Sequence, residues 1–222
     1  WPSSESHLIV VRIHHAVAGS TWFDRGMSPE TTPAHEAAAS RPGTGTEHPD
    51  DLDQMSQDHI LVERTICFAD LSGFTRFTKQ HGPHIAVELL DEFRRKSREV
   101  AARRGVRVAK WLGDGGMLVG TEATPTIAWA GHLIEHFANT QTVNLRVGLA
   151  TGEALLFEGD DYIGEPVNLA AKLCSVADPG QILANCEVAD LPPWIRVEET
   201  ADLEIRGAGT FSGIQRLAVV AL

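Results

Sequence analysis

The sequence predicts an α+β fold of the ferredoxin-like kind, in which helices pack on an antiparallel sheet. From residue 61 onward the hydrophobic pattern gives a strand, a helix, a hairpin, a second helix and a further strand, in that order. A hairpin makes neighbouring strands antiparallel, so a strictly alternating, doubly wound parallel sheet is excluded. Each helix can cover one face of the predicted sheet, which leaves the turns at one edge to build a site.

The composition divides the chain near residue 60. Residues 28–58 are rich in Pro, Ser, Thr, Gly and acidic residues and have almost no large apolar side chains, so burial cannot offset the entropy of ordering them. The apolar run within residues 7–23 is typical of a short strand or of a segment that binds a partner. We therefore expect residues 1–60 to be an N-terminal extension and flexible linker, and residues 61–222 to be one folded domain.

Charge and composition argue against several classes of function. The chain has 222 residues, 43% of them hydrophobic, and a formal net charge of −11, which disfavours binding to nucleic acid or to acidic membranes. It contains no apolar run of the roughly 18 residues that a membrane span needs. Three widely spaced cysteines, Cys67, Cys174 and Cys186, indicate neither a disulfide framework nor a zinc site. We expect a cytoplasmic protein with no nucleic-acid or membrane partner.

The first strand of the domain, residues 64–70, runs directly into an aspartate, Asp70, and a short glycine-containing turn. A carboxylate at a strand end beside exposed backbone N–H groups suits a metal ion that carries phosphates, because the carboxylate binds the cation and the amides bind the anion. A strand that stops at a polar turn with a hydrogen-bonded aspartate is the simpler alternative. Asp70 and its turn are therefore the first candidate site.

Two helices are predicted, one on each side of a hairpin in the sequence. Residues 82–105 have apolar side chains at helical spacing and end at a glycine, Gly105, which is a common C-terminal stop. Residues 124–140 form the second helix, with Thr124 as its N-cap and Pro125 in its first turn. Both helices are expected to pack on the sheet.

The hairpin of residues 106–120 carries Gly113-Asp114-Gly115-Gly116 at its tip, where glycine supplies the positive φ that a tight turn requires. Asp114 is therefore expected at a turn. After the second helix come two strands, residues 144–151 and 152–159. A turn then leads to a helix that begins around Glu165 or Pro166. Short strands follow at residues 180–185, 194–199, 202–207 and 213–220.

Five short motifs carry a resemblance to a known family. They are FADLSGFTRFT, KWLGDG, RVGLATGE, GEPVNLAAKL and GQIL, in this order along the chain. In order and approximate spacing they resemble the class III nucleotidyl cyclase catalytic domain, from Ile66 to Leu217. One motif would be weak, because Gly-Asp-Gly is common in turns, whereas five in order are specific. The resemblance implies that residues 61–222 are a cyclase catalytic domain.

Members of the resembled family convert a nucleoside triphosphate to its 3′,5′-cyclic monophosphate and release pyrophosphate. Two divalent cations, Mg²⁺ or Mn²⁺, can assist this reaction, one at the attacking 3′-hydroxyl and one at the phosphates. By resemblance Asp70 and Asp114 are the two metal-binding aspartates, and both cations prefer such hard oxygen ligands. The resemblance also implies that backbone amides after Asp70 hold the β- and γ-phosphates, with Phe74 as a packing residue. The residues concerned are Leu71, Ser72, Gly73, Phe74 and Thr75.

The same resemblance implies that Lys110 and Asp161 recognise the base. Adenine offers an acceptor at N1 and a donor at its 6-amino group, for which an ammonium and a carboxylate are complementary partners. Guanine presents the opposite pattern, so this pair favours ATP as the substrate. Asp160 is the rival of Asp161 for this role, and solvated charges near turns are the simpler interpretation of Lys110 and Asp161.

Asn168 and Lys172 lie four residues apart at the start of a helix, which places them on one face. In the resembled family the asparagine orients the ribose, and a cation one turn later stabilises the transition state. That cation is most often arginine, whose planar fork binds phosphate oxygens better than an ammonium does. We therefore expect an active but slow adenylyl cyclase. Arg206 is a candidate triphosphate contact or, equally, a surface charge on a strand.

The resemblance implies a head-to-tail homodimer, because the metal aspartates of one chain and the base, ribose and transition-state residues of another build each site. An isolated monomer should then be inert. Two other classes stay open: a nucleotide-binding regulatory domain that has lost turnover, and a ferredoxin-like domain that binds protein or RNA, which the acidic charge opposes. Polymerases and diguanylate-forming enzymes are less favoured, because their G-G-[D/E]-E-F hairpin is absent.

Overall fold

The computed structural model describes residues 8–9, 60–140, 143–157, 161–206 and 208–220. The linker predicted over residues 28–58 and the rival base contact Asp160 lie outside these ranges. Leu8–Ile9, from the apolar run near the N-terminus, form a short strand (β1) that pairs in parallel with a strand of the domain. No helix among the described residues is long and apolar enough to cross a membrane.

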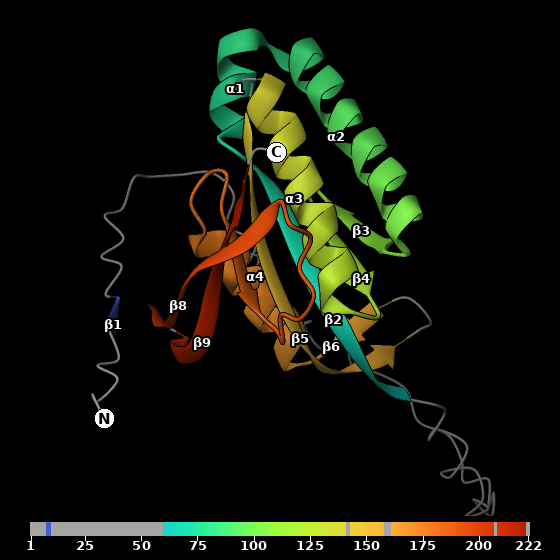
Figure 1. The fold of residues 1–222 in the computed structure, drawn as a ribbon. Helices are drawn as coiled ribbons and strands as arrows, with labels where there is room; N and C mark the ends of the chain where they lie inside the picture. The colour runs from blue at the N-terminus through green and yellow to red at the C-terminus, as the bar shows by residue number, and fades with distance from the viewer. Residues whose placement is uncertain (1–7, 10–59, 141–142, 158–160, 207, 221–222) are drawn as a thin grey trace, which may run out of the picture. The chain divides into compact units, whose positions relative to one another are not determined.

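The domain is built on one sheet with helices on both faces (Figure 1). Its further strands are β2 (Ile60–Ser72), β3 (Arg107–Leu112), β4 (Gly115–Gly120), β5 (Asn144–Phe157), β6 (Asp161–Ile163), β7 (Ile182–Asn185), β8 (Ile195–Ile205) and β9 (Gly209–Val219). Its helices are α1 (Phe74–His81), α2 (Pro83–Arg104), α3 (Ala123–Thr140) and α4 (Glu165–Val176).

The sheet order is β1-β8-β9-β7-β5-β2-β4-β3, and β6 pairs with β5 beside this path. Most neighbours are antiparallel, which confirms the predicted α+β sheet. Two pairs are parallel, β5 with β7 and β1 with β8. The first follows from the connection, because α4 lies between β5 and β7 in the sequence and crosses over the sheet. The sheet is therefore mixed rather than wholly antiparallel.

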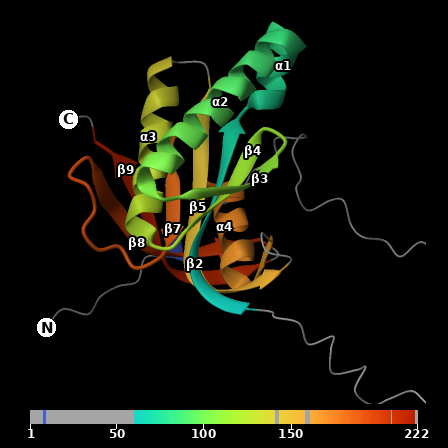
Figure 2. The same ribbon diagram turned by 90° about the vertical axis from the view of Figure 1, so that its right-hand side faces the viewer.

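The helices α2 and α3 cover one face of the sheet, and α4 covers the other (Figure 2). Alternate residues of β2 divide between the two cores: Cys67 and Ala69 face α2 and α3, whereas Ile66 faces α4. In the first core Phe93 of α2 and Phe137 of α3 are fully buried and meet edge to face, with ring centroids 6.0 Å apart. β2 thereby contributes side chains to the core on each face of the sheet.

Long strands replace pairs of shorter predicted ones. The strands expected at residues 144–151 and 152–159 are one continuous strand, β5, and those expected at 194–199 and 202–207 are joined in β8. β5 pairs with β2 without a break, from Ile60 opposite Leu156 to Ser72 opposite Asn144. Because β5 is hydrogen-bonded to β2 along nearly its whole length, it continues through Gly152, where the sequence pattern predicted a second strand to begin.

Two local predictions were wrong at element boundaries. The first strand does not stop at Asp70 but continues to Ser72, and α1, a helix that was not predicted from the sequence, begins directly after Gly73. Gly73 has φ 83°, a left-handed conformation that glycine adopts without strain. In α3 the first helical residue is Ala123, so Thr124 is not the N-cap; its hydroxyl donates to the Ala189 carbonyl at 2.7 Å instead.

Candidate functional site

Asp70 and Asp114 lie side by side, as the sequence analysis expected of a pair of metal ligands. Asp70 is near the end of β2, where it pairs with Gly115, the residue that follows Asp114 at the hairpin tip. The amide of Leu71 donates to the carbonyl oxygen of Asp114 at 3.3 Å, which ties the tip to β2. Asp70 is buried, with 4% of its surface exposed. The two aspartates thus lie at the same end of the sheet, where β2 ends and β4 begins.

The neighbourhood of Asp114 disfavours its charged form. Burial, followed by the negative charge of Asp70, raises the pKa of the Asp114 carboxyl to about 6. A backbone hydrogen bond and the positive charge of Arg146 act in the opposite sense but are smaller effects. A cation bound between the two carboxylates would relieve this repulsion.

Arg146 on β5 lies beside the two aspartates, although no role was predicted for it from the sequence. It pairs directly with Asp70 across β2 and β5, and its Nη2 and Nε donate to Asp70 Oδ2 at 2.6 and 2.9 Å. The residue stands in the RVGLATGE motif, so its presence near the site was predictable. Its partner was not, because the register that sets Arg146 opposite Asp70 is a tertiary feature.

The two carboxylates fit a divalent cation that also binds phosphates. Asp70 Oδ1 is buried and has no hydrogen-bond partner, and a Cβ on Gly115 would lie 3.1 Å from it. The glycine therefore keeps space free beside an unsatisfied hard oxygen, which is the donor that Mg²⁺ and Mn²⁺ prefer. Within the described residues no cluster of three His, Cys, Asp or Glu side chains could hold a metal. Phosphate oxygens and water would have to complete the coordination of a cation here.

Lys110 and Asp161, the predicted base-recognition pair, are in contact. The Lys110 ammonium lies 2.5 Å from Asp161 Oδ2, and this hydrogen bond is the main cause that lowers the pKa of the Asp161 carboxyl. The amide of Tyr162 donates to the other oxygen, Oδ1, at 3.0 Å. Both side chains are more than a third exposed, so each can turn toward a ligand. Residues far apart in the sequence therefore form one polar pair at the surface.

Asn168 and Lys172 lie on α4, on the face of the sheet opposite α2 and α3. Asn168 is exposed, whereas Lys172 is half-buried with its Nζ 5.8 Å from the centre of the Phe211 ring, a cation–π contact. Arg206 is exposed in the turn after β8. Three strands separate β8 from β2 in the sheet, so Arg206 is remote from Asp70 within one chain.

The predicted phosphate-binding segment is not an open turn. Leu71 and Ser72 are the last residues of β2, Gly73 precedes α1, and Phe74 and Thr75 start that helix. The Leu71 amide already donates to Asp114. An anion near the start of α1 would be favoured by the helix dipole.

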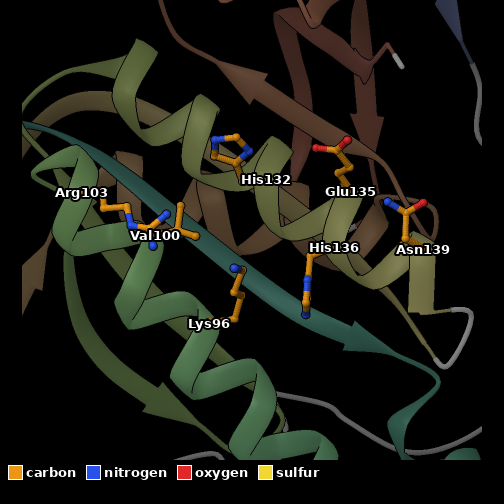
Figure 3. Close-up of a pocket in the computed structure, with 7 residues that line it drawn as sticks. All are labelled: Lys96, Val100, Arg103, His132, Glu135, His136 and Asn139. Atoms are coloured by element: carbon orange, nitrogen blue, oxygen red, sulfur yellow. The ribbon is translucent and has the colours of Figure 1, made fainter. Parts of the chain in front are cut away.

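A groove of about 310 Å³ lies between α2 and α3, on the face away from α4 (Figure 3). It is lined by Lys96, Val100, Arg103, His132, Glu135, His136 and Asn139. Two histidines of α3 reach α2 beside it: His136 contacts Glu92 at 2.7 Å, and the His132 ring accepts from Arg104 at 2.7 Å. Burial, followed by the charge of Arg104, lowers the pKa of His132. None of the predicted site residues lines this groove.

The sequence is similar to those of nucleotide cyclases. A sequence model of the adenylate and guanylate cyclase catalytic domain matches residues 57–215. An uncharacterised protein of Mycobacterium tuberculosis is 41% identical over 131 residues, which are 58% of this chain and 34% of that protein. An adenylate cyclase of Streptomyces coelicolor is 35% identical over 140 residues, 62% of this chain and 36% of that protein. The chain spans about a third of the length of these relatives.

Solved structures share the fold of the described domain. The guanylyl cyclase Cya2 has a TM-score of 0.60 at 19% identity and covers 73% of this chain and 95% of its own. The adenylyl cyclase CyaB from P. aeruginosa has a TM-score of 0.57 at 24% identity and covers 74% of this chain and 97% of its own. These likenesses confirm the predicted fold. Because the two neighbours are named for different nucleotides, they leave the choice of substrate open.

Proposed function

The chain belongs to the adenylate and guanylate cyclase catalytic domain family, and on this premise we propose that it is an adenylyl cyclase that converts ATP to 3′,5′-cyclic AMP and pyrophosphate. The observation that carries the proposal is the apposition of Asp70 and Asp114, with one oxygen of Asp70 buried and unpaired. An unsatisfied buried carboxylate oxygen lowers stability, which favours a domain that binds a cation there over a domain that only binds another protein.

At the α-phosphorus the proposed reaction forms one bond and breaks one. The 3′-oxygen of the ribose attacks the α-phosphorus in line, the bond to the bridging oxygen of the β-phosphate breaks, and the 3′-hydroxyl proton leaves to solvent. Asp70 and Asp114 would hold two divalent cations, whose charge would favour loss of the 3′-hydroxyl proton and offset the charge of the phosphates. The aspartates must be ionised for this, and the positive charge of Arg146 favours the ionised form of Asp114.

Specificity for ATP is proposed from the Lys110–Asp161 pair. In a bound state the ammonium donates to N1 of adenine and the carboxylate accepts from the 6-amino group, so the two side chains exchange their mutual contact for contacts to the base. The pair is already assembled in the free chain, and the entropic cost of ordering the two side chains on binding is reduced accordingly.

Two residues of α4 would contact the ribose and the phosphates. Asn168 would orient the ribose, and Lys172 would stabilise the charge that develops on the phosphates. The cation–π contact with Phe211 limits the freedom of the long Lys172 side chain. We further propose that these residues act on a nucleotide held by the aspartates of a second copy, in a head-to-tail homodimer with two equivalent sites.

Complementation between two inactive chains tests the proposal. Asp70→Ala and Asn168→Ala are each expected to lose cyclic AMP formation, and a mixture of the two should regain up to a quarter of the wild-type rate, because statistical pairing restores one intact site in half of the dimers. The measurement is cyclic AMP formed from ATP with Mn²⁺ or Mg²⁺, with GTP as a parallel substrate. A wild-type chain that turns over only GTP would contradict the assignment of ATP. If the mixture stays inactive while the wild type is active, the shared site is wrong.

A regulatory domain that binds nucleotide without turnover is the second candidate, and the lysine at position 172 favours it. Lys172→Arg separates the two candidates. For a slow enzyme we expect turnover to rise roughly tenfold, since an arginine fork adds an aimed donor to a position whose full loss costs about 10²–10³ in rate. Lys172→Gln is the matched control, which should be slower than the wild type. Binding of ATP without turnover in all three chains would favour the regulatory domain.

A further inference from the structure

Arg146 makes two converging hydrogen bonds to Asp70. Its Nε and Nη2 donate to the same oxygen, Oδ2, at 2.9 and 2.6 Å. The side chain of Arg146 is 23% exposed and that of Asp70 is 6% exposed, so water competes little for these bonds. Because the guanidinium is planar and rigid, two N–H groups on one oxygen define the orientation of the carboxylate. Arg146 therefore fixes the direction in which Asp70 points.

The second oxygen of Asp70 is left for another partner. Oδ1 is buried and accepts no hydrogen bond. It faces the hairpin tip, since a Cβ on Gly115 would lie 3.1 Å from it, and Asp114 is the residue before Gly115. A buried carboxylate oxygen without a donor is costly unless a cation binds it. Arg146 thus satisfies one oxygen of Asp70 and leaves the other directed at the predicted cation position.

The same guanidinium also contacts α4 of its own chain, the helix whose Asn168 and Lys172 would serve the second site of the proposed homodimer. Arg146 Nη1 donates to the carbonyl oxygen of Ser175 in the last turn of α4, at 3.2 Å. The Ser175 hydroxyl in turn donates to the Lys172 carbonyl at 2.7 Å. A cation at a helix C-terminus is favoured by the helix dipole. One side chain therefore connects the aspartate on β2 to the helix that carries Asn168 and Lys172.

We propose that Arg146 is a positioning residue of the cation site: it holds Oδ2 of Asp70 so that Oδ1 is presented to a divalent cation. Its third hydrogen bond ties the end of α4 of the same chain to this arrangement. The inference rests on the proposed function, because it assumes that Asp70 and Asp114 bind the cation. If Arg146 only balanced the charge of Asp70, it would compete with the cation, and removing its charge would raise the affinity for the metal. If Arg146 positions Asp70, removing its side chain lowers that affinity.

Binding of Mn²⁺ alone to the full chain, followed by the electron paramagnetic resonance signal of free Mn²⁺, separates these roles. Arg146→Lys keeps the charge but loses the planar fork, and Arg146→Gln loses both. We expect each variant to bind Mn²⁺ about 10–100-fold more weakly than the wild type, as removal of a residue that orients a metal ligand does. Unchanged affinity in Arg146→Lys together with higher affinity in Arg146→Gln would overturn the proposal.

Matched controls separate failure of this inference from failure of the proposed function. Arg196→Lys and Arg196→Gln make the same substitutions in an exposed ion pair with Glu198 on β8 and should leave Mn²⁺ affinity unchanged. Asp70→Asn and Asp114→Asn should abolish Mn²⁺ binding. If they do not, the cation site itself is wrong. If they do while both Arg146 variants bind as well as the wild type, only the role of Arg146 is wrong.

A measurement on the wild-type chain avoids dependence on how the variants fold. In an NMR spectrum selective for arginine side chains, the Nε–H of Arg146 should exchange slowly with water, because it donates to a buried oxygen. As diamagnetic Mg²⁺ saturates the site, we expect this proton to remain protected, since the cation binds Oδ1 and leaves Oδ2 to Arg146. Fast exchange on addition of Mg²⁺ would mean that the cation displaces the guanidinium, which would refute the proposal.

Discussion

Asp114→Asn is expected to abolish cyclic nucleotide formation and, at the same time, to make the metal-free chain more stable at pH 8. The activity should fall by roughly 10²–10³-fold or more, because asparagine removes a charged cation ligand from the point where charge develops. Asparagine has nearly the same shape as aspartate, so the hairpin tip should be unaltered. Opposite effects on activity and stability are typical of a group placed for chemistry at the expense of folding.

The gain in stability follows from the direction of the pKa shift. The pKa of the Asp114 carboxyl rises from 3.8 to about 6 on folding. Its contribution to the free energy of unfolding is therefore fully present below pH 3.8 and is lost as the pH rises through 6. At pH 8 the ionised carboxylate destabilises the fold, and asparagine removes this penalty. Since Asp114 is only partly buried, solvent screening reduces the expected gain to about 1 kcal/mol.

Urea unfolding with a chelator present, at pH 8 and at pH 4.5, measures this effect. The difference between the Asp114→Asn variant and the wild type should shrink at pH 4.5, where the wild-type carboxyl is mostly protonated and resembles the amide. Asp91→Asn, at an exposed position of α2, is the control and should change stability at neither pH. Loss of stability at pH 8 in Asp114→Asn would contradict the apposition of the two aspartates.

Gly148→Ala is expected to be the most destabilising single-methyl addition in the domain, by about 3 kcal/mol or more. Gly148 lies on β5 directly beneath α4. A Cβ there would lie 2.2 Å from the Cys174 amide nitrogen and 2.3 Å from the Ala170 carbonyl oxygen, both backbone atoms of that helix. Backbone atoms cannot move aside as a flexible side chain can, so α4 must shift from the sheet or the strand must bend.

The free energy of unfolding from urea titration tests this prediction, with activity as a second measurement. Because α4 carries Asn168 and Lys172, a displaced helix should also lower turnover. Gly152→Ala is a matched control on the same strand: its nearest contact is Pro166 Cγ at 3.5 Å, an ordinary packing distance. It should cost little. Equal stability of the two variants would show that α4 does not approach the sheet as closely as described.

Much of the candidate site follows from local sequence. Asp114 was expected at a glycine turn, and the structure has it between β3 and β4, because only a tight turn suits that run of glycines. Asp70 was expected at a strand end, two residues early. The helix of Asn168 and Lys172 begins at Glu165, as the proline at its first turn predicts. These features depend on a few consecutive residues, and a local pattern determines them.

Patterns in the sequence alone predict the α+β class, the hairpin tip at Asp114, the start of α4 and, through five motifs, the family. The unbroken pairing of β5 with β2, which sets Arg146 opposite Asp70, became visible only in the folded chain. The same is true of the contact between Lys110 and Asp161 and of the close approach of α4 to β5 at Gly148. Turns and caps depend on the dihedral preferences of neighbouring residues, whereas register and ion-pair partners depend on how distant segments pack.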